Sequence, residues 1–190
     1  MAVSKVQIAN RALQKLGAKR ISSLEQDHPN ARSMNAAFEL VRDTELRRYA
    51  WSFAIKRDSI AADGDDSLWG NWNRYSLPND FIRLIRDDES GSHVDWKIEG
   101  LYILSKDASP LEIRYIARIE DPNYYDALFI EAFAGRLASQ CYTEIKDSST
   151  TDKESVKDDY KADIAEAKRV GAIEKEAQEF PEDEWLAARR

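Results

Sequence analysis

The sequence predicts an α+β protein: an antiparallel helical bundle of about four helices with an inserted small antiparallel β-sheet subdomain. Apolar residues recur at helical spacing over residues 1–50 and again over 120–177, whereas apolar and polar residues alternate within 51–119. The last segment, 178–190, is acidic and contains Pro181, which predicts an extended C-terminal tail. We therefore expect one helical domain made of two chain segments, a β-subdomain between them and a tail.

The composition is typical of a globular domain with a single core. The chain has 190 residues, 43% of them hydrophobic and 33% charged. No apolar run approaches the length of a membrane span and the first residues lack a signal-peptide pattern, so we expect no membrane contact. The net charge is −7, and residues 147–190 contribute −5 of it, with 13 acidic and 8 basic side chains. This balance disfavours tight binding of nucleic acid.

Two amphipathic helices are expected before residue 50. Ser4 is a favourable N-cap for the first helix, and Gly17 stands where a left-handed C-terminal residue is wanted. The second helix begins at Pro29, with Asp27 or His28 as its N-cap.

The segment RYAWSFAIKR, residues 48–57, is expected to join the second helix to the first strand. Its aromatic residues are Tyr49, Trp51 and Phe53. They alternate with small or polar neighbours, which is the period of a strand. Aromatics beside Arg47 and Arg48 could also stack on bases and hold phosphates. The alternation and the acidic net charge favour the structural interpretation, in which the aromatics close the helical layer against the sheet.

A small antiparallel sheet of three or four strands is expected between residues 75 and 119. Apolar alternation marks strands at 81–85, at 94–98 and from Leu111 onward, and Glu99 with Gly100 predicts a hairpin turn. Residues 63–73, DGDDSLWGNWN, predict a solvated loop in which two tryptophans fold back over apolar groups. The loop lacks the glycine position and the terminal glutamate of a calcium-binding loop.

Helices are expected again after residue 120. Asp121 and Pro122 read as the cap and first turn of a helix that is apolar on nearly all sides between residues 128 and 142. Such a helix must be buried on several sides, so we expect it at the centre of the bundle. A final helix over about 150–176 has a narrower apolar stripe and would cover the central helix.

The tail carries large apolar residues that the predicted core does not use: Phe180, Trp185 and Leu186. Packing on their own domain and docking on a partner are both open, since aromatic anchors are common at interfaces. The interface candidates are these three residues together with Arg47, Arg48, Trp69 and Trp72.

No residue pattern indicates catalysis, a cofactor or a metal ion. The sequence has no nucleophile motif and no phosphate-binding loop, and its two histidines and single cysteine lack metal-ligand spacing. The adjacent carboxylates Asp65 with Asp66 and Asp87 with Asp88 could serve a glycosidase, but such pairs in loops are normally solvated. We therefore assign no catalytic, cofactor-binding or metal-binding residue.

Several motifs occur together and in a fixed order along the chain. They are NRALQKLGA, ELRRYAWSFAIKR, RYSLPNDFIRL, IEGLYIL, and LEIRYIARIEDP followed by YDALF. In this order and spacing the sequence resembles the tail tubular protein A family of short-tailed bacteriophages. The likeness extends from about Ala9 to Ala177, and the segment from 178 onward matches least.

The resemblance implies a structural virion protein, a head-to-tail adaptor. It would form a dodecameric ring between the portal and the tail nozzle, a protein similar to tail tubular protein B, and contact with the tail fibre stays open. Genomic DNA would pass through the ring without sequence-specific binding, and assembly would take place in the cytoplasm of the host bacterium. The family fold is a helical bundle with an inserted β-subdomain, and no catalytic motif is carried over. The alternatives are a carbohydrate-active hydrolase of a phage tail and a small nucleic-acid-binding module.

Overall fold

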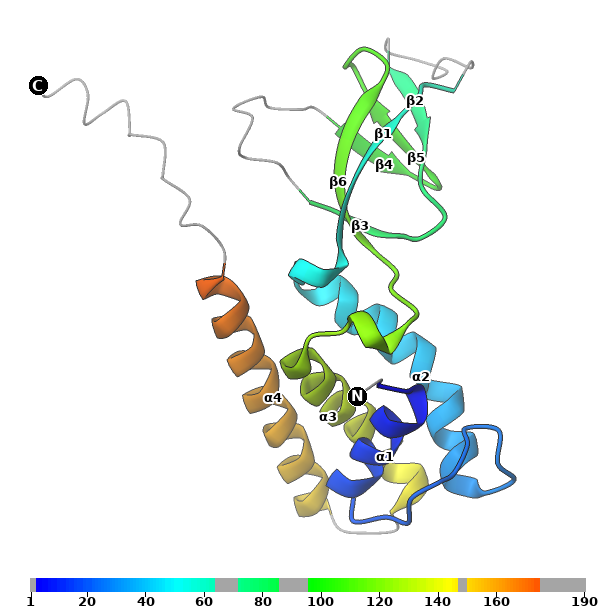
Figure 1. Ribbon diagram of the computed structural model, residues 1–190, viewed down its shortest axis with the longest axis vertical. Helices are drawn as coiled ribbons and strands as arrows, with labels where there is room; N and C mark the ends of the chain where they lie inside the picture. The colour runs from blue at the N-terminus through cyan, green and yellow to red at the C-terminus, as the bar shows by residue number, and fades with distance from the viewer. Residues whose placement is uncertain (1–2, 64–71, 86–95, 147–149, 175–190) are drawn as a thin grey trace, which may run out of the picture.

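The computed structural model describes residues 3–63, 72–85, 96–146 and 150–174. These residues form four α-helices and two three-stranded antiparallel sheets, which confirms the predicted α+β class. The helices are α1 (Lys5–Lys15), α2 (Pro29–Arg48), α3 (Ala127–Ile145) and α4 (Thr150–Ile173). The helices run side by side and both sheets lie at one end of the bundle (Figure 1).

Helix α3 lies at the centre of the bundle, as its apolar sequence predicts. It packs against α1, α2 and α4, and Phe129, Phe133 and Leu137 have no exposed surface. Gly135 allows α4 to come close, because a Cβ atom there would lie 3.4 Å from the Cα of Tyr160. The mostly apolar surface of this helix is therefore buried by three neighbours.

The first two helices begin where their capping residues predict. The Ser4 Oγ accepts a hydrogen bond from the Gln7 backbone N–H (3.2 Å), and the Gln7 side chain accepts one from the Ser4 N–H (2.9 Å). Gly17 follows α1 with φ of 60°, a value that favours glycine. At the start of α2, the N-cap is His28, whose Nδ1 accepts from the Asn30 N–H (3.1 Å).

The start of the central helix differs from the prediction. Asp121 and Pro122 belong to a separate 3₁₀ turn, Pro122–Tyr124, and Asp121 caps that turn. The cap of α3 is Asp126, whose Oδ1 accepts from the Leu128 and Phe129 backbone N–H groups. Asp121 and Asp126 can both act as an N-cap, so the residue type alone did not show which of them begins the long helix. Asp121 begins only a single turn.

The β-subdomain contains two sheets where one sheet of three or four strands was expected. The first sheet has the order β1 (Ile55–Ile60), β6 (Leu111–Ala117), β3 (Phe81–Leu84). The second has the order β2 (Asn73–Ser76), β5 (Tyr102–Ser105), β4 (Trp96–Glu99). The prediction missed the second sheet because β1 and β2 carry little apolar alternation. The four inner positions of β1 are exposed, and β2 has only four residues.

The hairpin predicted around Glu99 and Gly100 is present, displaced by one residue. Glu99 pairs with Tyr102 across β4 and β5, so the two turn residues are Gly100 and Leu101. Gly100 has φ of 62°, and glycine adopts this conformation without steric cost. Between the two sheets lies a second core, which includes the fully buried side chains of Tyr75 and Ile103.

The aromatic segment after α2 joins the helix to the first strand, as predicted, but its alternating aromatic residues are not themselves in a strand. Residues Ser52–Ala54 form a 3₁₀ turn, and the strand begins only at Ile55. Trp51 and Phe53 pack on Phe129 of α3, with ring centroids 5.0 Å apart in both pairs. The alternating aromatics therefore belong to the helical core, where they meet the entry of the first strand. No helix among the described residues is long and apolar enough to cross a membrane.

Candidate functional site

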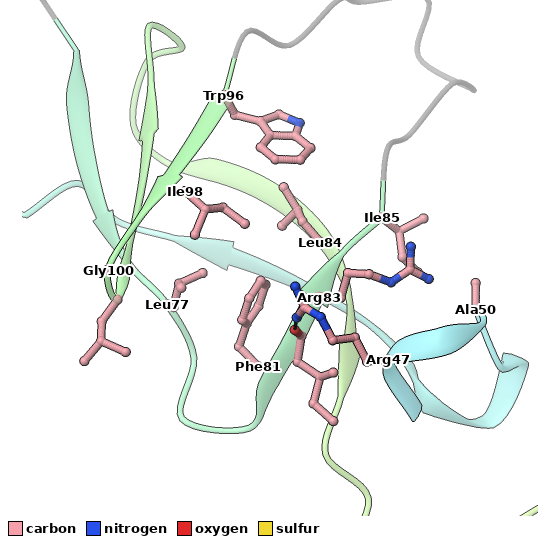
Figure 2. Close-up of a pocket in the computed structure, with 12 residues that line it drawn as sticks. Arg47, Ala50, Leu77, Phe81, Arg83, Leu84, Ile85, Trp96, Ile98 and Gly100 are labelled. Atoms are coloured by element: carbon pink, nitrogen blue, oxygen red, sulfur yellow. Dashed lines mark hydrogen bonds between the residues drawn. The ribbon is translucent and has the colours of Figure 1, made fainter. Parts of the chain in front are cut away.

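A groove of about 760 Å³ lies between the two sheets, next to the end of α2 (Figure 2). Its apolar lining comes from both sheets and their loops: Leu77, Phe81, Ile82, Leu84, Ile85, Trp96, Ile98 and Leu101. Figure 2 shows Phe81 and Leu84 of β3 facing Ile98 of β4 across the groove. Both β3 and β4 are edge strands of their sheets.

The rim of this groove has the character of a contact surface. Leu101 is 76% exposed and Ile98 is 41% exposed, and apolar groups beside a strand edge are common at protein contacts. Arg47 and Arg83 are the charged residues of its described lining. The groove can therefore pack apolar side chains, while its described lining offers no carboxylate or histidine for proton transfer.

Arg47, one of the interface candidates, connects the bundle to the first sheet. Its guanidinium Nη1 donates a hydrogen bond to the backbone carbonyl of Ile82 in β3, drawn as a dashed line in Figure 2. Position 47 lies in the last turn of α2, so this bond fixes the direction in which the helix meets the sheet.

Within the β-subdomain, Asp80 connects three segments of the chain. Its carboxylate accepts from the Tyr115 hydroxyl (2.9 Å) and from the Lys56 ammonium (2.5 Å). Its backbone carbonyl accepts from the Arg118 N–H (2.6 Å). Partial burial would raise the pKa of Asp80, but the hydrogen bonds from Lys56 and Tyr115 outweigh burial and lower that pKa. The ionised carboxylate therefore holds β1 and β6 to the turn before β3.

Arg48, the next interface candidate, belongs to a buried polar cluster in the bundle. At its centre is Glu45, whose side chain has no exposed surface. The Tyr160 hydroxyl donates to the Glu45 carboxylate at 3.0 Å from both oxygens. Arg48 lies 3.3 Å and Arg136 lies 3.8 Å from Glu45 Oε1, measured from each Nε. These four residues, here called the Glu45 cluster, join α2, α3 and α4.

Burial dominates the acid–base properties of the Glu45 cluster. It raises the pKa of Glu45, and the charges of Arg48 and Arg136 and the Tyr160 hydrogen bond offset only part of that effect. Burial and the neighbouring Glu45 raise the pKa of Tyr160 to about 12. Tyr160 therefore remains protonated and acts as a donor that holds α4 on the bundle.

Trp72, a third interface candidate, lies just before β2 and is half-buried. The ammonium groups of Lys97 and Lys106 lie over its ring, 4.8 and 5.1 Å from the centroid. Contacts of this length are cation–π interactions.

The remaining candidates lie outside the described residues. They are Trp69, Phe180, Trp185 and Leu186, and the carboxylates Asp65, Asp66, Asp87 and Asp88. Within the described ranges no group of three or more His, Cys, Asp or Glu side chains could hold a metal ion. The thiol of Cys141 is buried, and burial raises its pKa to about 11, so it stays protonated at neutral pH.

Sequence reasoning missed the Glu45 cluster and the lysines over Trp72. Glu45 follows Phe38 and Val41 at helical spacing on the buried face of α2, so a charge at a core position was the available signal. Lys97 and Lys106 had no such signal, because their meeting with Trp72 depends on strand pairing. Comparison with protein-family models and with curated proteins found no match to this sequence.

Proposed function

We propose that the protein is a head-to-tail adaptor of a short-tailed bacteriophage, a structural component of the virion. In this role a ring of copies joins the portal to the tail nozzle and forms part of the channel through which DNA passes. The proposal rests on the resemblance of the ordered sequence motifs to the tail tubular protein A family. A helical bundle with strands between its second and third helices is the architecture that this resemblance implies.

The observation that carries the proposal is that motifs distant in the sequence contact one another in the fold. Phe53 of ELRRYAWSFAIKR contacts Tyr125 of YDALF, with ring centroids 5.7 Å apart. Asp80 of RYSLPNDFIRL bonds to Tyr115 of LEIRYIARIEDP. The Tyr125 hydroxyl donates to the carbonyl of Ile119 (2.7 Å). The Phe53–Tyr125 and Tyr125–Ile119 contacts lie at the joint between the bundle and the β-subdomain, and the Asp80–Tyr115 bond lies within the β-subdomain. The fold thus brings the motifs into contact, which supports reading them as one likeness.

A ring also requires each copy to present two different surfaces, because head-to-tail contacts close a cycle only when they are heterologous. The groove rim with Leu101 is apolar, whereas α4 is charged along its exposed side. Such unlike surfaces suit contacts of this kind. An acidic subunit would also repel DNA phosphates and so let the strand slide. A channel lined mainly by Lys and Arg in an image of the ring would contradict the sliding part of the proposal.

The direct test is assembly with the portal protein of the same phage. Native mass spectrometry of portal rings mixed with the full chain should show the added mass of one ring of copies. Portal rings whose mass is unchanged at saturating concentrations of the chain would refute the adaptor. A ring of unrelated symmetry, such as a bacterial sliding clamp, is the control and should gain no mass.

We further expect the tail to contribute to this attachment, through the portal or an adjacent copy, because it contains Phe180, Trp185 and Leu186. Deleting residues 178–190 should reduce the fraction of portal rings that carry the adaptor. A variant with the same residues in scrambled order separates the effect of these anchors from the effect of tail length. Unchanged attachment after the deletion would exclude a role for the tail and leave the adaptor itself standing.

A further inference from the structure

The outer face of the second sheet combines basic and aromatic side chains. The pairing places Arg74 and Lys97 on either side of Leu104. Because side chains alternate across a strand, the neighbours two positions away point to the same side. The face therefore comprises Trp72, Arg74, Ser76, Lys97, Glu99, Tyr102, Leu104 and Lys106, here called the basic face. The opposite side of the sheet carries Tyr75 and Ile103, which are fully buried.

Two lysines of the basic face are exposed and lack a carboxylate partner among the described residues. Lys97 and Lys106 both place their ammonium groups over the Trp72 ring. Arg74 differs, because its guanidinium covers the Tyr102 ring at 4.7 Å and forms an ion pair with Asp63 at 3.4 Å. Glu99 is exposed on the same face, opposite Tyr102. The Arg74–Asp63 pair is neutral, so the two lysines outnumber this one carboxylate and give the face its positive charge.

This arrangement suits carboxylates better than nucleic-acid bases. A base would have to stack on Trp72, where the two ammonium groups already lie. An ammonium has three donors and pairs readily with carboxylates. The chain as a whole has a charge of −7, which opposes the approach of a nucleic acid from a distance. An acidic peptide with aromatic residues would satisfy both the lysines and the apolar surface between them.

The chain contains one segment with that composition. Residues 174–188, EKEAQEFPEDEWLAA, have six carboxylates and one lysine, which gives −5, together with Phe180 and Trp185. We propose that this acidic segment of one copy docks on the basic face of a second copy. The complementary charges select the face, and an aromatic side chain of the segment packs beside Trp72 and Leu104.

The choice of a second copy rests on the proposed ring. An acidic segment on one surface and a basic face on another form a heterologous pair, which can repeat from copy to copy until the ring closes. The segment follows the C-terminal end of α4, where Gly171 lies against Tyr49 beside the end of α2. In Figure 1 this end of α4 lies at the end of the bundle that faces the sheets.

The test measures binding of a fluorescent peptide, residues 174–188, to the full chain by fluorescence anisotropy. We expect saturable binding that weakens as salt increases. Lys97→Glu with Lys106→Glu should weaken binding about tenfold, since each reversed surface charge pair changes affinity modestly. Lys19→Glu with Arg20→Glu makes the same change of charge in the loop between α1 and α2, and this control should bind like the unaltered chain.

A charge exchange makes the test specific. A peptide with Glu182→Lys, Asp183→Lys and Glu184→Lys should bind the Lys97→Glu/Lys106→Glu chain better than it binds the unaltered chain. The inference would be overturned if the peptide did not bind. It would also be overturned if Lys97→Glu/Lys106→Glu and the control Lys19→Glu/Arg20→Glu lost the same amount of affinity. Preferential binding of a single-stranded oligonucleotide, lost in Lys97→Glu/Lys106→Glu, would overturn it in favour of a nucleic-acid surface. Portal assembly is measured separately, so failure here is distinguishable from failure of the proposed function.

Discussion

Replacing Phe129 with alanine is expected to lower the free energy of unfolding by about 4 kcal/mol. Its side chain has no exposed surface. Its ring lies 5.0 Å from the rings of Trp51 and Phe53 and 5.1 Å from that of Tyr125, measured between centroids. The substitution would therefore remove buried area and edge-to-face contacts together, and would leave a cavity where the chain enters and leaves the β-subdomain.

Urea unfolding followed by circular dichroism measures this loss. Leu40→Ala is the matched control, because Leu40 also lies in a helix but is 73% exposed, and its effect should stay within about 0.5 kcal/mol. A loss at Phe129 of less than about 1.5 kcal/mol would show that the aromatic cluster is not closely packed.

Removing both arginines from the Glu45 cluster should cost about 3 kcal/mol at pH 7. In Arg48→Met with Arg136→Met, the buried carboxylate of Glu45 keeps its Tyr160 hydrogen bond and loses the two cations nearest to it. An uncompensated charge in a buried site is more costly than the loss of the pair as a whole, even though both arginines are partly hydrated.

The effect of these substitutions should depend on pH. Burial already raises the pKa of Glu45 in the folded protein. Because the folded pKa lies above the ordinary pKa of glutamate, about 4.3, protonation of Glu45 stabilises the folded protein. This contribution is fully present below about pH 4.3 and is lost as pH rises through the folded pKa. Without Arg48 and Arg136 the folded pKa would rise further, so the loss would extend to higher pH. The gap in stability between the variant and the unaltered chain should thus be small at pH 4 and large at pH 7.

Adding Glu45→Gln to the double variant provides the decisive comparison. Glutamine can still accept from Tyr160 but carries no charge, so most of the lost stability at pH 7 should return. Exposed arginines supply the control: Arg20→Met with Arg32→Met should change stability by less than about 1 kcal/mol at both pH values. A gap between the Arg48→Met/Arg136→Met variant and the unaltered chain that is independent of pH would show that lost packing, not the buried charge, causes the destabilisation.

Much of the helical bundle could be predicted from the sequence because its signals are local. Ser4, Gly17 and Pro29 mark helix ends through interactions within a few residues, and the composition of α3 alone predicts its burial. The two sheets could not be predicted in the same way. Strand β1 runs IKRDSI without apolar alternation, and it is a strand because β6, more than fifty positions away, pairs with it.

The candidate site was predictable only as a set of unusual residues. Arg47 and Arg48 are adjacent in the sequence, yet one bonds to the carbonyl of Ile82 and the other joins the Glu45 cluster. Adjacent positions on a helix point in different directions, and their partners come from segments that only the fold brings near. The same holds for Trp72, because Lys97 lies on β4 and Lys106 directly follows β5.

The pairing of β1 with β6 has an evolutionary consequence. Ile55 faces Ile116 in this pair, so the chain leaves the bundle and returns to it at points about 5 Å apart. Strand β3 adds a third attachment, because Ile82 lies in the helical core and accepts from Arg47. The second sheet makes no such contact with the bundle among the described residues, so a change confined to β2, β4 and β5 would leave the geometry of α2 and α3 intact. Related genes can therefore diversify this outer sheet, in length and in sequence, while inheriting one unchanged helical scaffold.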